Sequence, residues 1–197
     1  MNYQALHPDF YNRDPRIVAY ELLGKYLIHE RSKHVPQLAR IVETEAYLGP
    51  HDKAAHSAKG RTPRTEVMFG EAGHAYVYLI YGMHHCLNVV TQGPGVASAV
   101  LIRALEPLSG IELPTHGPGR LCKALHIDRS LNGKNLSHRP LWIANAPALP
   151  HDAVHCGPRI GIDYAQEWVA APLRYCIKDH PLLSRKTSTT PIMRKLD

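Results

Sequence analysis

The alternation of apolar and polar positions along the chain predicts a protein built mainly of β-strands. Short runs of β-branched and aromatic residues, some alternating with polar ones and some continuously apolar, recur throughout the sequence. We expect strands at residues 39–48, 75–81, 86–91, 99–105, 141–144, 158–162 and 173–178. A Gly-Pro-Gly turn at residues 93–95 separates two of them.

Two segments have the signals of helices instead. Asp14 followed by Pro15 marks a helix start, because aspartate caps free amide groups and proline fits the first turn. Apolar residues then recur at helical spacing, so we expect a helix over about residues 15–28. A Gly-Pro-Gly sequence opens a second helix over about residues 117–126. The pattern predicts a single compact α+β domain with a curved, mainly antiparallel β-sheet flanked by helices.

The composition is that of a globular protein suited to a polyanion. The chain has 197 residues, and its hydrophobic fraction of 44% excludes general disorder. Lysine and arginine number 23 against 17 aspartates and glutamates, a net charge of +6, and there are 10 tyrosines and 14 histidines. Such a balance favours a polyanionic partner such as nucleic acid. We expect the folded domain to span residues 1–185 and residues 186–197 to form a basic, flexible tail.

The same simple features argue against several classes of protein. No apolar run approaches the ~18 residues that span a bilayer, and the first residues contain no apolar segment typical of a signal peptide. The four cysteines are far apart and form no Cys-x-x-Cys pair, so neither a zinc knuckle nor a redox dithiol is indicated. We therefore expect a cytoplasmic monomer with free thiols, associated with the nucleoid if the protein is bacterial.

The segment at residues 41–57 carries the first candidate chemistry. In a strand, alternate side chains share a face, so Glu43, Glu45 and Tyr47 point one way. A carboxylate beside an aromatic wall can act as a general base on water. A solvated strand edge is the alternative that spacing alone leaves open.

The loop after this strand offers a second hypothesis, a metal site. It contains His51, Asp52 and His56, whose spacing matches no familiar zinc pattern. The His-x-Glu and Pro-Cys-x-x-Cys elements of zinc-dependent nucleobase deaminases are absent from the sequence. We therefore expect no metal.

Tyrosines gather in the next predicted strand. Tyr76 and Tyr78 lie on one strand face, and Tyr81 stands beside Gly82 at the following turn. Such rings can stack on nucleobases, although packing within the sheet would equally explain the first two. A ring pushed out at a turn can instead wedge into a base stack.

Longer blocks of ordered sequence surround these motifs. They are IVETEAYLGPHDKAAHS at 41–57, RTPR at 61–64, MFG at 68–70, HAYVYLIYGMHHCLNVV at 74–90, LIRALEP at 101–107, GPGRLCKAL at 117–125 and PRIGIDYAQEW at 158–168. Together they resemble the alkyladenine (3-methyladenine) DNA glycosylases, from about residue 8 to residue 185. The resemblance implies one compact domain with a curved antiparallel sheet. It also implies a monofunctional enzyme that excises alkylated or deaminated purines from double-stranded DNA with neither a metal nor an organic cofactor.

The resemblance also assigns roles by position. Glu45 matches the general base that activates water, and Arg103 matches a residue that orders this water. Tyr47 and Tyr78 match rings that stack on the flipped base, and Tyr81 matches the residue that fills the vacated space. The remaining matches line the base pocket: His56 contacts the base edge or the adjacent sugar-phosphate, Asn88 guards against the guanine amino group, and Ile162 and Asp163 align with the C-terminal wall. The family usually has small or apolar residues at that wall, and Asp163 departs from this pattern.

Basic residues complete the expected interface, with Arg61, Arg64 and Arg120 as candidates for gripping phosphates. A non-catalytic nucleic-acid-binding module would explain the charge and the tyrosines, but not the carboxylate of Glu45 beside Tyr47. A glycosylase that forms a Schiff base through a lysine is disfavoured, because the strand with the candidate base has no lysine.

Overall fold

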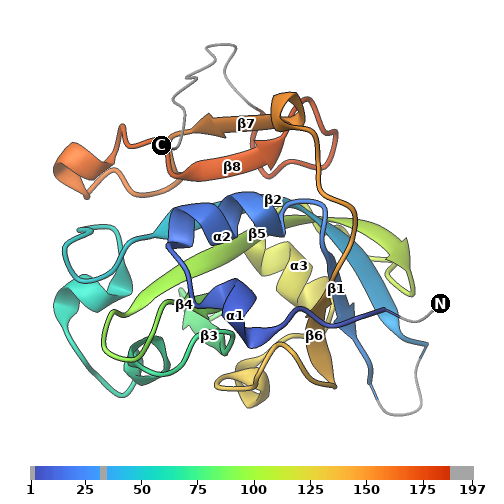
Figure 1. Ribbon diagram of the computed structural model, residues 1–197, viewed down its shortest axis with the longest axis horizontal. Coiled ribbons are helices and arrows are strands. Elements are labelled where there is room, and N and C mark those ends of the chain that lie inside the picture. Colours follow the sequence, from blue (N-terminus) through green and yellow to red (C-terminus); the bar gives the residue numbers. More distant parts are fainter. Residues whose placement is uncertain (1–2, 32–34, 187–197) are drawn as a thin grey trace.

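The computed structural model describes residues 3–31 and 35–186, which form one eight-stranded sheet with a few short helices (Figure 1). The strands are β1 (Tyr26–His29), β2 (Gln37–Tyr47), β3 (Ala75–Ile80), β4 (His84–Thr91), β5 (Ser98–Ser109), β6 (Leu141–Ala144), β7 (Val154–Gly157) and β8 (Arg174–Ile177). The α-helices are α1 (Pro8–Tyr11), α2 (Pro15–Leu22) and α3 (Pro118–Ala124). Single turns of 3-10 helix occur at His56–Lys59, Glu66–Phe69, Arg129–Leu131, His151–Ala153 and Gln166–Trp168.

Strand β2 is the centre of the sheet. The order is β3-β4-β5-β2-β1-β6, and β5 pairs with β2 along one edge. The other edge of β2 is shared: β1 pairs with Gln37–Arg40, and β8 pairs with Glu43–Glu45. Strand β7 then pairs with β8, and every strand pair is antiparallel. The predicted α+β class and antiparallel sheet are confirmed.

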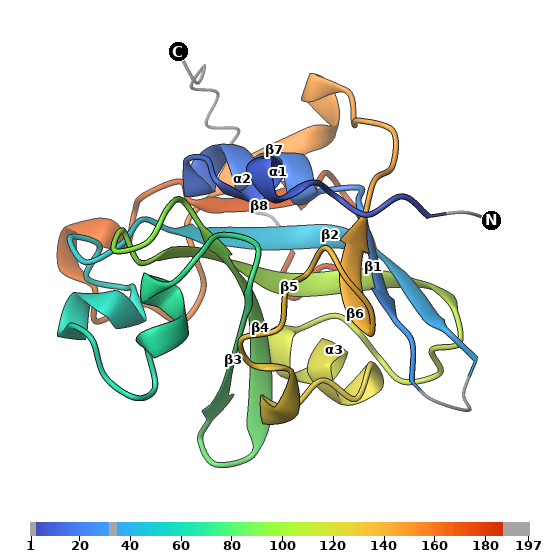
Figure 2. The same ribbon diagram turned by 60° about the horizontal axis from the view of Figure 1, so that its bottom comes forward.

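Short helices pack against this sheet. The Asp14 side chain accepts a hydrogen bond from the Arg16 amide, as the sequence predicts for a helix start. Helix α2 packs on β2, β5 and β8, and the Thr44 hydroxyl donates to the Ala19 carbonyl. Helix α3 packs on β4 and β5 beside the β3–β4 hairpin, which extends away from the rest of the sheet in Figure 2.

The predicted helix over residues 15–28 is wrong in its second half. Helix α2 ends at Leu22, and Gly24 has a positive φ of 83° that turns the chain. The next residues form β1, which is hydrogen-bonded on both edges, by β2 and by β6. Because both neighbours of β1 come from later in the chain, the local pattern of apolar residues could not distinguish strand from helix here.

The predicted strand at 158–162 is also wrong. The paired strand is β7, which ends at Gly157, and Pro158 follows it without an amide to donate. The next two residues direct their polar groups elsewhere: the Arg159 guanidinium binds Asp52, and the Ile160 amide binds Glu45.

The remaining expectations concern the cysteines, membrane-spanning helices and the C-terminal tail. All four cysteines are free, as the sequence predicts. Within the described residues, no helix combines the length and apolar character needed to cross a bilayer. The tail predicted at residues 186–197 lies, apart from its first residue, outside the described part of the chain.

Candidate active site

Irregular pairing between β2 and β5 brings an arginine to the two strand carboxylates. Glu43 is paired with Ala104 and the next residue, Thr44, with Ile102, so Arg103 is the extra residue of a bulge. The bulge directs the Arg103 side chain to the face that carries Glu43 and Glu45. Its Nη1 lies 3.3 Å from Glu45 Oε2 and its Nε 3.5 Å from Glu43 Oε1.

The Glu45 carboxylate is fully buried and held by three donors. Oε2 accepts a hydrogen bond from the Tyr47 hydroxyl at 2.9 Å and faces the Arg103 guanidinium. Oε1 accepts from the Ile160 amide at 2.8 Å. Because a carboxylate offers about four acceptor positions, one remains for a further donor such as water.

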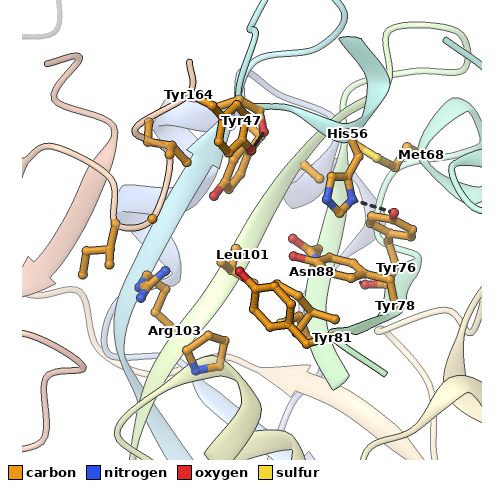
Figure 3. A pocket seen from close by; sticks show the side chains of 18 residues that line it. Tyr47, His56, Met68, Tyr76, Tyr78, Tyr81, Asn88, Leu101, Arg103 and Tyr164 are labelled. Atoms are coloured by element: carbon orange, nitrogen blue, oxygen red, sulfur yellow. Dashed lines mark hydrogen bonds between the residues drawn. The ribbon is translucent and has the colours of Figure 1, made fainter. Parts of the chain in front are cut away.

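A cavity of about 200 Å³ lies beside the side chains that contact this carboxylate, and Figure 3 shows two of them, Tyr47 and Arg103, at its edge. The three partners of Glu45 all line it, whereas Glu45 itself lies behind them. Six of the residues that line it have aromatic side chains: Tyr47, His56, Tyr76, Tyr78, Tyr81 and Tyr164. Pockets for drug-sized molecules are larger, about 300–1,000 Å³, so this cavity suits a single flat ring system.

His56 forms part of the aromatic wall as a neutral ring. Its Nδ1 is hydrogen-bonded to the Tyr76 hydroxyl at 2.9 Å, and its ring lies 4.5 Å from the Tyr78 ring, edge to face. Burial, and then the positive charges of Arg64 and Lys59, lower the pKa of His56 to about 4. The cavity therefore presents an uncharged imidazole near neutral pH.

Tyr47 is supported from behind by a buried ion pair. Burial, reinforced by the charge of Glu45, raises the pKa of Tyr47 well above its ordinary value, so its hydroxyl keeps its proton. The Arg159 guanidinium carbon lies 4.7 Å from the Tyr47 ring centre and pairs with the Asp52 carboxylate through two hydrogen bonds, of 2.5 and 2.9 Å. Both side chains of that pair are fully buried.

The geometry does not gather the predicted metal candidates. The Asp52 carboxylate is occupied by Arg159 and by two backbone amides, and His56 is bound to Tyr76. His51 is exposed beside Trp168. Over residues 3–31 and 35–186, no group of three histidine, cysteine or acidic side chains is placed to hold a metal ion.

The tip of the β3–β4 hairpin projects beside the cavity. Tyr81 has a positive φ of 51°, followed by Gly82 at 68°, so the chain reverses tightly there. The Tyr81 side chain lines the cavity mouth and remains 85% exposed, and nearby Met83 is 72% exposed. The tip of the hairpin therefore presents two large apolar side chains to solvent next to the cavity.

The other predicted pocket residues divide into two groups. Asn88 is buried and lines the cavity, and its Nδ2 donates to the Tyr76 carbonyl at 3.1 Å. Ile162 is buried and also lines it. Asp163 is exposed and is not among the residues that line the cavity.

The three predicted phosphate-binding arginines are exposed in different settings. Arg61 donates to both oxygens of Glu66, so its charge is paired within the protein. The Arg64 guanidinium carbon lies 5.0 Å from the centre of the Tyr78 ring, which lines the cavity. Arg120 is exposed near the start of α3, two residues after Pro118, which itself lines the cavity.

Sequence reasoning missed several contacts and residues that build the site. It placed Tyr76 on one strand face with Tyr78 but did not find the hydrogen bond of the Tyr76 hydroxyl to His56. The ion pair of Asp52 with Arg159 joins positions 107 residues apart, and no local pattern could have linked them. Tyr164 stands on the rim of the cavity.

Comparisons with known proteins agree on one family. The model of a family described as methylpurine-DNA glycosylase matches residues 9–181. A relative from Legionella pneumophila (strain Lens), named "Putative 3-methyladenine DNA glycosylase", is 56% identical over 177 residues, which cover 89% of this chain and 96% of the relative. Relatives of the same name from Myxococcus xanthus (strain DK1622) and Anaeromyxobacter dehalogenans (strain 2CP-1 / ATCC BAA-258) are 52% and 51% identical, and the matches cover 93% and 83% of their lengths.

Proposed function

The chain belongs to the methylpurine-DNA glycosylase family and is a DNA glycosylase of base-excision repair, and we propose that it flips alkylated or deaminated purines out of duplex DNA and hydrolyses their N-glycosidic bond. In this proposal a Glu45-activated water attacks the sugar, and the product is an abasic site with no strand cleavage. The observation that carries the proposal is the fully buried Glu45 carboxylate behind an aromatic cavity, whose lining residues Tyr47 and Arg103 it contacts.

The cavity accounts for capture of an extruded base. A base inside a duplex is out of reach, and extruding it costs a few kcal/mol, least where damage has weakened pairing. We assign Tyr81, which projects beside the cavity, to the space that the base leaves. Tyr47 and Tyr78 supply ring faces for the base, and a cationic alkylpurine gains roughly 0.5–2 kcal/mol from such faces.

The chemical step follows from the position of the carboxylate. As the bond between C1′ and the base nitrogen breaks, its electron pair leaves with the base and the sugar becomes oxocarbenium-like. The negative charge of Glu45 stabilises this sugar, and the carboxylate then takes a proton from the water whose oxygen attacks C1′. Because Glu45 is fully buried before DNA binds, water reaches it as the nucleotide enters and the side chains in front of it adjust.

A single hydrolytic step, with no covalent intermediate, agrees with the lining of the cavity. A glycosylase that also cleaves the strand uses an amine that forms a Schiff base with C1′. Among the described residues that line the cavity there is no lysine. Reduction with borohydride during the reaction is therefore expected to trap no covalent complex.

Replacement of the proposed base tests the function. Glu45→Gln keeps the size and the hydrogen-bonding oxygen of the side chain but removes its negative charge and its ability to take a proton. We expect single-turnover release of 3-methyladenine from methylated duplex to fall at least about 100-fold, the lower range of general-base effects. Binding to the same duplex should change by less than about threefold.

The exposed Glu112, outside the cavity, provides the matched control. Glu112→Gln should release base at the wild-type rate. Release by Glu45→Gln close to the wild-type rate would contradict the catalytic assignment. Tight binding of damaged duplex by the wild type with no release at all would favour the non-catalytic binding module.

A further inference from the structure

The segment that follows β8 returns to the back of the candidate site. Its Ser184 donates to Glu43 twice, from the backbone amide to Oε2 at 2.6 Å and from the hydroxyl to Oε1 at 2.8 Å. Glu43 is fully buried one strand repeat before Glu45. A residue close to the end of the described chain therefore caps a carboxylate in the middle of the sheet.

The Ser184 hydroxyl also touches the arginine of the site. It accepts a hydrogen bond from Arg103 Nε at 3.2 Å while donating its own proton to Glu43. The other end of the same guanidinium, Nη1, faces Glu45 at 3.3 Å. The one hydroxyl thus fixes the rotation of a planar group whose far side contacts the proposed general base.

A second arginine holds the segment in place. Arg174 on β8 donates from Nε to Glu43 Oε1 at 2.6 Å and from Nη2 to the Arg185 carbonyl at 2.5 Å. Glu43 is therefore shared between the strand arginine and Ser184, and the chain on both sides of the Ser184–Arg185 peptide is tied down.

Burial alone would lower the pKa of Arg103, but Glu45 and Glu43 offset this and raise it, so the guanidinium stays charged.

We propose that residues 182–185 form a positioning strap in which Ser184, together with Glu43, sets the orientation of Arg103 against Glu45. This inference rests on the proposed function, because orientation matters only if Arg103 and Glu45 act in base release. Ser184 lies beyond residue 181, where the family match ends. Glu43 and Ser184 touch no reacting atom in this scheme and act through Arg103.

Removal of the hydroxyl is the first test. Ser184→Ala keeps the backbone amide on Glu43 but loses both hydroxyl contacts. Since a hydrogen bond to a charged group is a strong one, we expect single-turnover base release at saturating enzyme to fall about 5- to 20-fold. Binding to a duplex with an abasic-site mimic should stay within about twofold, because the strap does not line the cavity. Ser184→Thr, which keeps a hydroxyl, should restore release to within about threefold of the wild type.

A matched control addresses stability. Ser137 is half-buried, and its hydroxyl donates to the Leu6 carbonyl away from the cavity. Ser137→Ala should release base at the wild-type rate, and urea unfolding of both alanine variants should confirm that they are folded under assay conditions.

A double-mutant cycle with Arg103 separates positioning from general loosening of the fold. If Ser184 acts through Arg103, then Ser184→Ala should cause no further loss in an Arg103→Met background. The inference would be overturned if the fold-losses in base release of the two single variants multiplied in the double variant. It would also be overturned if Ser184→Ala released base as fast as Ser137→Ala. Neither result affects the proposed function, which depends on release by the wild type and its loss in Glu45→Gln.

Discussion

At the scale of single residues, burial decides the charge that His56 brings to the cavity. The ring is surrounded by Tyr76, Tyr78 and the positive charges of Arg64 and Lys59, and its pKa falls to about 4. A proton on this ring would be poorly solvated and would face two other cations. Near neutral pH the ring is therefore uncharged, and in the proposed function a cationic alkylpurine in the cavity would meet no repulsion from it.

This lowered pKa predicts how stability depends on pH. Between about pH 6.5 and pH 4 the unfolded chain binds a proton at His56 and the folded chain does not, so the free energy of unfolding falls as the pH falls through this range. Below about pH 4 both states are protonated and His56 contributes no further loss. We expect His56→Gln to lose less stability than the wild type between pH 6.5 and 4, measured as urea midpoints at each pH.

The exposed His138 supplies the control, since His138→Gln should keep the wild-type slope. Equal slopes for the wild type and His56→Gln would show that this ring binds its proton as readily in the folded protein as in the unfolded chain, and would contradict the lowered pKa.

At the scale of elements, the sequence predicts the face that carries the chemistry but not what completes it. The period of two along β2 correctly separates Glu43, Glu45 and Tyr47 from Thr44, which faces α2. The bulge at Arg103 depends on the register between two strands separated by about fifty residues, and that register leaves no mark in either strand alone.

Contacts with residues distant in the sequence also explain the two elements that were predicted wrongly. Residues 26–29 have an apolar pattern that suits a helix or a buried strand, and pairing with β2 and β6 decides the outcome. Residues 158–162 look like a strand, but contacts to Asp52 and Glu45 use their polar groups. In both cases a partner distant in sequence overrode the local preference.

The ion pair between Asp52 and Arg159 joins the loop after β2 to the loop after β7, and removal of one partner alone should strongly destabilise the fold. Asp52→Asn keeps the shape but leaves the fully buried Arg159 charge without its counterion. We expect the free energy of unfolding to fall by about 3–5 kcal/mol, measured by urea denaturation. Replacement of both residues, as Asp52→Leu with Arg159→Met, should cost less than Asp52→Asn, because no charge is then buried alone.

The exposed pair of Arg61 and Glu66 provides the comparison. Glu66→Gln should leave the urea midpoint close to that of the wild type, because water solvates the remaining charge. If Asp52→Asn were as mild as Glu66→Gln, the loop pair would not hold the wall behind Tyr47.

At the scale of the whole molecule, the net charge of +6 matters for DNA binding only where unpaired positive side chains lie near the cavity. Arg120 is exposed on α3, whose Pro118 lines the cavity, and Arg64 is exposed over the ring of Tyr78, which also lines it. Arg61 is neutralised by Glu66. Formal charge therefore overstates how much each arginine near the cavity can attract a phosphate, and ion pairing within the protein decides which of them contribute.

The salt dependence of DNA binding measures directly which of these arginines contact phosphates. Each phosphate neutralised by the protein contributes about 0.9 to the slope of log K against log salt concentration. Arg120→Ala should therefore reduce the slope by about 1 if its side chain meets one phosphate, whereas Arg61→Ala should reduce it by clearly less, because Glu66 already balances that charge. Arg139 serves as the control: it packs over Trp142 on β6, at the opposite end of the sheet order from β3, and Arg139→Ala should leave the slope unchanged.

The measurement is titration of a lesion-containing duplex at several salt concentrations with the Glu45→Gln background in every protein, so that the DNA stays intact. Equal slope changes for Arg61→Ala and Arg120→Ala would mean that the pair with Glu66 opens when DNA binds, and the charge around the cavity would then have to be counted in full.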